Sequence, residues 1–175
     1  MLRDGYDAVD VSTIAAEAGI GRTTFFRYFG SKPAVVWSAF DATITWLQES
    51  LTTHKGQGDP LDAVRAAVVG STRSALYSSD VWLERFKLLD SHPSLQSGAY
   101  EHWEAWRRAV AEHIAEAEGL DPSDPVPMAI AGACHGVFVS ELRNLHNTDD
   151  DREVLLQRFD KNLAQVCEAL RALLR

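Results

Sequence analysis

The chain has 175 residues, of which 46% are hydrophobic and 24% charged, and its formal net charge at pH 7 is −8. This composition is that of a globular protein with a buried core, and it excludes disordered and collagen-like chains. Two cysteines, Cys134 and Cys167, lie far apart in apolar stretches, which argues against a disulfide framework and predicts buried free thiols in a reducing cytoplasm. No secretory leader opens the chain, and its longest nearly apolar run, 128–139, is too short for a bilayer, so we expect neither secretion nor membrane insertion.

The negative charge is unevenly distributed along the sequence. Residues 1–40 carry equal numbers of basic and acidic side chains, so the whole acidic excess belongs to the remainder. A polyanion would therefore be tolerated at the N-terminal end and repelled elsewhere.

Hydrophobic residues recur with the helical period, and no alternating strand pattern is found, so the predicted fold class is all-α. Asp10 is placed to cap a short helix that ends at Gly19, and a second short helix follows over about 21–29. Ser31 precedes a long helix over 33–53, which has a proline in its first turn.

The remaining segments also predict helices, for a total of about eight. Asp80 is a candidate cap for one of them. Loops are expected at 54–60, which is rich in glycine, and at 121–127, which is rich in proline. The expected helices cover residues 60–77, 80–89, 95–118, 127–146 and 151–174.

Two short helices joined by Ala-Gly-Ile-Gly at 18–21 have the length and turn of a helix-turn-helix. In that motif the N-terminal residues of the second helix enter the DNA major groove. Arg22 can form two hydrogen bonds to guanine, and Thr23 can contact a base edge. A surface helical hairpin with incidental charges would show the same spacing, so both interpretations stay open on spacing alone.

The run DVSTIAAEAGIGRTTFFRYFGSKPAVV closely resembles the DNA-binding head of TetR-type transcriptional regulators. The resemblance rests on an Ile-Ala pair, an Ala-Gly turn, the Thr-Phe-Phe of the second helix, Phe29 and a final Ser-Lys. It implies base reading by Arg22 and Thr23. It also implies phosphate contacts from a further set of side chains: Ser12 or Thr13, Thr24, Tyr28 and Lys32.

This sequence departs from the family pattern in two respects. Phe26 stands where the family usually has tyrosine, so a phosphate-binding hydroxyl is lost, for which Arg27 can compensate. The helix that opens the family head is missing before Gly5, so we expect an incomplete head. Two explanations stay open, a start that lies inside a longer gene and a chain that has been truncated. Without that helix, the side chains of Ile14, Phe25 and Phe29 are expected to lose much of their cover.

The resemblance divides the chain into a DNA-binding head at 1–36 and an effector-binding and dimerisation domain at 37–175. Paired heads one helical turn apart read a palindromic operator. A homodimer is therefore expected, through a four-helix bundle made from 127–146 and 151–174 of each subunit. The alternative is that the apolar stripe of 155–174 belongs to the core of its own subunit.

Aromatic residues gather between these two regions, and the resemblance favours a pocket among them for a small hydrophobic effector. The candidate lining residues are Trp46, Tyr77, Trp82, Phe86, Trp103 and Trp106. The alternative is that they only fill the core. The form RTTFFRYF is most similar to regulators near mycofactocin gene clusters, which would imply an acyl chain or acyl thioester as effector. The predicted function is a cytoplasmic repressor that the effector releases from its operator.

The sequence does not predict an enzyme, a cofactor or a metal site. Histidines beside glutamates, such as His113 beside Glu112, lack the HExxH spacing, and there is no CxxC pair, phosphate-binding glycine loop or nucleophile elbow. The alternative function is a helical protein that binds a partner protein or a membrane surface without binding DNA. Operator sequence, effector identity and the choice between repression and activation are not encoded in recognisable motifs.

Overall fold

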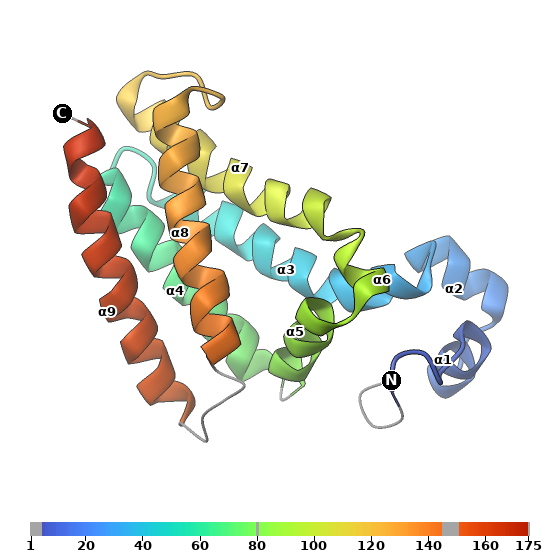
Figure 1. The fold of residues 1–175 in the computed structure, drawn as a ribbon. Coiled ribbons are helices and arrows are strands. Elements are labelled where there is room, and N and C mark those ends of the chain that lie inside the picture. Colours follow the sequence, from blue (N-terminus) through green and yellow to red (C-terminus); the bar gives the residue numbers. More distant parts are fainter. Residues whose placement is uncertain (1–4, 80, 145–150, 175) are drawn as a thin grey trace.

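The structure, a computed structural model, describes residues 5–79, 81–144 and 151–174. Over these residues the chain is all-α, as predicted, with nine α-helices and a final 3₁₀ turn (Figure 1). The helices are α1 (Val11–Glu17), α2 (Arg22–Phe29), α3 (Lys32–Thr53), α4 (Pro60–Ser78), α5 (Trp82–Ser91), α6 (Pro93–Gln96), α7 (Ala99–Glu118), α8 (Pro125–Asn144) and α9 (Arg152–Leu170), followed by η2 (Arg171–Leu174).

Residues 5–29, with α1 and α2, form the head, and their boundaries follow the local sequence signals. Asp10 Oδ1 accepts a hydrogen bond from the backbone N–H of Thr13 at 2.7 Å, so the predicted cap is present. Gly19, with φ of +67°, and Gly30, with φ of +70°, take up backbone conformations that side chains disfavour, and each follows the end of a helix. The predicted helix-turn-helix is therefore confirmed.

α3 is one unbroken helix that begins at the head and continues into the body, which comprises the rest of the chain. Ser31 Oγ accepts from the N–H of Ala34 at 3.3 Å, and Pro33 lies in the first turn. The body face of α3 buries Trp37, Phe40 and Leu47. The proposed domain boundary at residue 36 falls inside this helix, so head and body share it.

α4, α8 and α9 lie on the side of the molecule away from the head, and α7 packs between α3 and α8 (Figure 1). Trp106, Phe138 and Phe159 are fully buried where these helices meet. Arg65 pairs with Asp160 at 2.8 Å, which joins α4 to α9 across the outer edge of this packing.

The structure corrects two predicted boundaries. The single helix expected over 95–118 is broken, because α6 ends at Gln96 and α7 begins at Ala99. Leu95 is fully buried, and the weak helix former Gly98 lies at the bend that lets α7 run across α3. α8 begins inside the predicted loop, at Pro125, because proline fits the first turn of a helix, where its missing N–H has no partner to lose. Asp80, and residues 145 and 146 of the predicted helix, lie outside the described residues.

The predicted apolar stripe of α9 is largely internal. Leu155, Phe159 and Leu163 are at most 4% exposed within the single chain, so this part of the stripe belongs to the subunit core. Cys134 on α8 and Cys167 on α9 are buried free thiols, as predicted.

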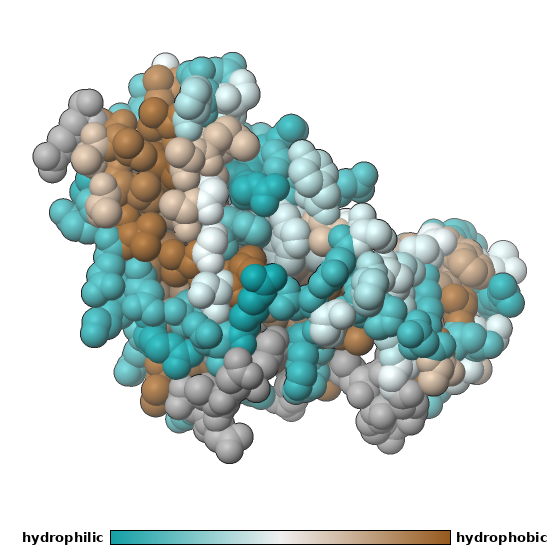
Figure 2. Space-filling model, in the orientation of Figure 1, coloured by the Kyte–Doolittle hydropathy of each residue, from teal (hydrophilic) through white to brown (hydrophobic). Residues whose placement is uncertain are grey.

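α8 keeps an apolar face that the other described residues do not cover. It is the one helix among the described residues that is long and apolar enough to cross a membrane, with a mean hydropathy of 1.2, yet only 39% of that stretch is buried. A band of hydrophobic surface runs between α8 and α9 (Figure 2). Gly132 and Gly136 on α8 have no atom within 4 Å of the position that a Cβ would occupy.

Glu141 is a carboxylate buried inside the body at 5% exposure. Its oxygens accept from Arg158 Nε at 3.1 Å and from Asn162 Nδ2 at 2.6 Å, so it joins α8 to α9. Such a group stabilises only while both oxygens stay paired.

We predict that Glu141→Ala lowers the free energy of unfolding by about 3 kcal/mol, because the Arg158 and Asn162 donors lose their buried acceptor. Urea denaturation followed by circular dichroism measures this change. Glu118→Ala, at an exposed position at the end of α7, is the matched control and should change the stability by less than about 0.5 kcal/mol. Equal effects of the two substitutions would contradict the structural role of Glu141.

Candidate nucleic-acid interface and ligand cavities

α2 has an apolar face and a polar face. Phe25 is 1% exposed, and its ring packs 5.3 Å from that of Phe29, which is partly buried. On the other side Arg22, Thr23 and Arg27 are exposed, and Tyr28 is 69% exposed. The buried side anchors the helix and leaves its polar side free for a ligand.

The burial of apolar side chains in the head differs in part from the loss that we expected without the first family helix. Phe25 is buried, although it was expected to lose cover, because Phe26 and Phe29 both pack against its ring. Ile14 and Phe29 are only partly buried, as that expectation required.

The two arginines of α2 rest on neighbouring aromatic rings. Arg22 Cζ lies 5.6 Å from the centroid of the Phe26 ring, and Arg27 Cζ lies 5.2 Å from that of Tyr28. Among the described residues, neither guanidinium has a carboxylate within ion-pair distance. Phe26 therefore supports Arg22, a role that does not need the hydroxyl of the family tyrosine.

Two of the predicted phosphate ligands are held by other contacts. Thr13 Oγ1 donates to Asp10 Oδ1 at 2.8 Å, and the hydrogen bonds from Thr13 lower the pKa of Asp10. Lys32 Nζ donates to the backbone carbonyl of Tyr6 and lies 4.1 Å from the centroid of its ring. Thr13 and Lys32 must each leave this partner to reach a phosphate, whereas the hydroxyls of Ser12, Thr24 and Tyr28 make no hydrogen bond among the described residues.

A small cluster around Tyr6 ties the head to the body, and the only sequence feature that coincides with it is the Gly-Tyr-Asp at 5–7. Tyr6 is 6% exposed, and its ring centroid lies 4.6 Å from that of His92, between α5 and α6. His92 Nε2 lies 3.1 Å from Asp7 Oδ2. These contacts, together with α3, set the position of the head.

α3 is also tied to α7 by an aromatic and ionic contact. The His102 ring stacks on Trp37 with 4.1 Å between centroids and an interplanar angle of 3°. His102 Nδ1 donates to Asp41 Oδ1 at 2.6 Å. A shift of α3 against α7 would have to break this contact.

The six aromatics predicted to line an effector pocket are separated by the structure. Trp46 and Trp82 line a cavity of about 270 Å³ between α3, α4 and α5. Trp103 lines a second cavity, of about 520 Å³, near the C-terminal end of α8.

The other three predicted aromatics line neither of these cavities. Phe86 is buried between Trp82 and Trp103, with 6.3 Å from its ring centroid to each. Trp106 is fully buried in the core, while Tyr77 is 55% exposed and its hydroxyl donates to Glu153 at 3.1 Å.

The second cavity contains a histidine with a strongly shifted pKa. Burial lowers the pKa of His135 to about 4, and the positive charges of Arg107 and Arg143 add to the effect. Arg143 itself pairs with Asp90 at 2.6 Å at the same cavity. At neutral pH the ring of His135 is therefore uncharged.

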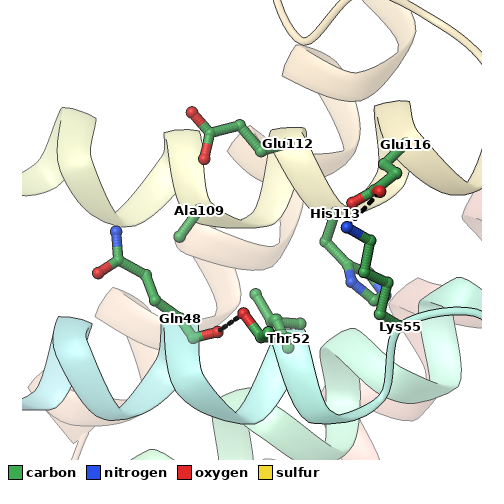
Figure 3. Close-up of a pocket in the computed structure, with 8 residues that line it drawn as sticks. Gln48, Thr52, Lys55, Ala109, Glu112, His113 and Glu116 are labelled. Carbon is green, nitrogen blue, oxygen red and sulfur yellow. Dashed lines mark hydrogen bonds and ion pairs between the residues drawn. The ribbon is translucent and has the colours of Figure 1, made fainter.

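A third cavity, of about 210 Å³, lies between α3 and α7 and is polar (Figure 3). Lys55 pairs with Glu116 at 2.5 Å beside His113, whose pKa burial lowers, and Glu112 points away from the histidine ring. The carboxylate of Glu116, which a metal ion at this place would need as a ligand, is thus paired with the ammonium group of Lys55. Within the described residues, no three His, Cys, Asp or Glu side chains come close enough to hold a metal.

We predict that the stability of the protein falls as the pH drops from 6.5 to about 4, in part because of His135. The unfolded chain binds a proton there that the folded chain does not, so this contribution is complete above pH 6.5 and is lost toward pH 4. His135→Phe should flatten this part of the stability–pH curve, measured by urea titration at several pH values. If the stability–pH curves of wild type and variant stay parallel, the His135 side chain is not buried in its neutral form, and the prediction fails.

Comparison with known proteins agrees with this architecture. Residues 1–37 match the family of bacterial regulatory proteins named tetR, and residues 58–171 match the MftR C-terminal domain. A Mycobacterium tuberculosis protein named as the mycofactocin biosynthesis transcriptional regulator MftR is 30% identical over 136 residues, which cover 78% of this chain and 69% of that protein.

Two solved structures share the fold. A TetR-family regulator of Mesorhizobium loti superposes with a TM-score of 0.66 at 18% identity, over 98% of this chain and 89% of the other. The TetR-family regulator PfmR of Thermus thermophilus gives a TM-score of 0.59 at 13% identity, over 95% and 91%. The chain therefore belongs to the TetR family of bacterial transcriptional regulators, in the mycofactocin-associated group that carries the MftR C-terminal domain.

Proposed function

We propose that this regulator is a repressor, which binds a palindromic operator as a homodimer and leaves it when a small, mainly apolar effector occupies the body. The observation that carries the DNA-binding part is the polar side of α2, where Arg22 and Arg27 are exposed and have no carboxylate partner among the described residues. In a chain of net charge −8, unpaired arginines on an exposed helix mark a surface for a polyanion.

The residues of α2 divide into two roles. Arg22 and Thr23 lie in the first turn, from which side chains reach base edges in the major groove. Arg27, Thr24 and Tyr28 lie further along and contact phosphates, with Ser12 from α1. Thr13 and Lys32 join them only after releasing Asp10 and Tyr6, respectively.

The uncovered face of α8 supports the homodimer. Ala129, Gly132, Ala133 and Gly136 are exposed or half-buried on this helix, and a glycine inside an exposed helix costs about 1 kcal/mol relative to alanine. Small residues on an apolar face allow a second helix to approach closely. Because Leu155, Phe159 and Leu163 are already buried, α9 contributes through residues nearer its end, such as Val166 and Leu170.

Release of the operator is proposed to follow from a movement of α3. Trp46, Trp82 and Trp103 stay in the proposal because they line two cavities. Phe86 lies between Trp82 and Trp103. An effector that favours one position of α3 against α7 moves the head, which α3 carries. Such coupling between two sites typically amounts to about 1–3 kcal/mol.

We predict that Arg22→Ala weakens binding to the operator by about 10- to 100-fold and relaxes sequence preference, because a bidentate base contact is lost. Arg27→Ala should weaken binding to all sequences and reduce the salt dependence by about one counterion. Fluorescence anisotropy with DNA from immediately upstream of the gene measures both effects.

Arg108→Ala is the matched control for these two variants, since Arg108 is an exposed arginine on α7, outside the head. It should bind the operator like the unsubstituted protein. An equal loss of affinity in all three variants would show general attraction of DNA to positive charge, and would overturn the assignment to α2.

We predict that Gly136→Arg gives a monomer, because a long charged side chain would stand on the face that α8 offers to its partner. Light scattering at micromolar concentration measures the mass. The single chain has open space at this position, so the variant should keep its helical circular dichroism. Glu118→Arg is the control for added positive charge and should stay dimeric. A wild-type protein that is monomeric at this concentration would contradict the proposed dimer.

A further inference from the structure

The cavity between α3, α4 and α5 combines aromatic walls with hydroxyl groups. Its volume is about 270 Å³, and the indoles of Trp46 and Trp82 form part of its wall. The α4 side and the chain that follows it supply four serines: Ser71, Ser74, Ser78 and Ser79. The hydroxyls of Ser71 and Ser78 donate to carbonyls of their own helix. Those of Ser74 and Ser79 make no hydrogen bond among the described residues.

Trp46 is fitted closely against α4 at this cavity. A Cβ on Gly70 would lie 2.8 Å from Cη2 of the indole, which is closer than such atoms approach in proteins. Glycine at this position therefore lets the indole lie against the α4 backbone. The side chain of Trp46 is still 36% exposed, so its fluorescence can report a molecule that enters the cavity.

Among the described residues that line the cavity, Arg85 is the one that carries a charge. It is half-buried, and no carboxylate of the described residues lies within ion-pair distance. Other arginines of the body each bind a carboxylate: Arg65, Arg73, Arg107, Arg143, Arg158 and Arg171. Arg108 also lacks a carboxylate within the described part of the chain, but it is exposed to water on α7.

This isolation of Arg85 is unusual in an acidic chain. Carboxylates outnumber basic groups by 25 to 17, yet none of the described ones reaches this half-buried guanidinium. Partial burial of a charge is unfavourable unless a counter-charge and hydrogen bonds compensate for lost water. An incoming anion would supply both, and Ser74 and Ser79 offer further donors beside it.

We propose that this cavity binds an organic monocarboxylate with an apolar or aromatic frame, and that Arg85 holds the carboxylate through a bidentate contact. One guanidinium neutralises one negative charge, so a single carboxylate is matched, whereas a phosphate dianion would keep an unpaired charge beside apolar walls. The frame of the ligand lies between the indoles of Trp46 and Trp82. This proposal deepens the effector part of the proposed function and rests on it.

The position of the cavity connects such a ligand to the head. Ala39, Ala42, Thr43 and Trp46 line it from α3, the helix that carries the head. A ligand that separates α3 from α4 or α5 changes the environment of that helix. The cavity also lies away from the apolar face of α8, so a homodimer through α8 and α9 leaves it accessible.

The experiment measures binding of octanoate and indole-3-acetate, each beside its primary amide, by calorimetry, and for octanoate and its amide also by quenching of tryptophan fluorescence. The acids should bind at least about tenfold more tightly than the amides, because only the acids pair with Arg85. Arg85→Gln should weaken acid binding by about 10- to 100-fold and leave amide binding unchanged. Arg108→Gln is the matched control and should bind the acids like wild type.

Thermal melting of both variants checks that they remain folded, and the acid–amide comparison in wild type does not depend on any variant. Equal affinity for acids and amides, an equal loss in both variants, or no binding of either acid at millimolar concentration would overturn the proposal. Operator binding, measured separately without ligand, tests the regulator function itself. Intact operator binding with no acid binding would thus remove this inference alone.

Discussion

The packing of α3 against the body is the constraint on which the rest of the structure depends. Trp37 and Phe40 bury one side of this helix in the core, while its first turn holds the head at Lys32. Stacking of His102 on Trp37 and its hydrogen bond to Asp41 fix the helix against α7. Head orientation is therefore set by contacts made within the body. A ligand that alters those contacts would move α2, the helix that we propose reads DNA, directly through α3.

The charged residues also differ between the head and the body. In the body, some acidic residues pair with arginines of another helix, as in Arg65–Asp160 and Arg158–Glu141, and these contacts join the helices of the bundle. On α2 the arginines instead lie on aromatic rings and keep their charge available. The acidic remainder of the surface repels DNA that approaches from other directions, which favours docking through the head alone.

Local signals predicted the head and the class of fold, because caps and breakers act within a few residues. Asp10, Gly19 and Ser31 form the predicted helix ends. The sequence could not reveal contacts between distant residues, such as Lys32 with Tyr6 or His92 with Asp7, because they depend on tertiary packing. It also grouped six aromatics by type, although side-chain direction sends Trp82 to a cavity and Trp106 to the core. That no carboxylate of the described residues pairs with Arg85 is likewise visible only in three dimensions.

The most direct test of the DNA-reading surface is a hydroxyl-radical footprint on the DNA immediately upstream of the gene. Two α2 helices held by one dimer should protect two symmetry-related sites centred about 10–10.5 base pairs apart, or at multiples of that spacing, on successive major grooves. Protection at this spacing, lost when the sequence is scrambled, is the result we expect. A footprint that is absent, or that is equally strong on scrambled DNA, would contradict the view that α2 reads an operator.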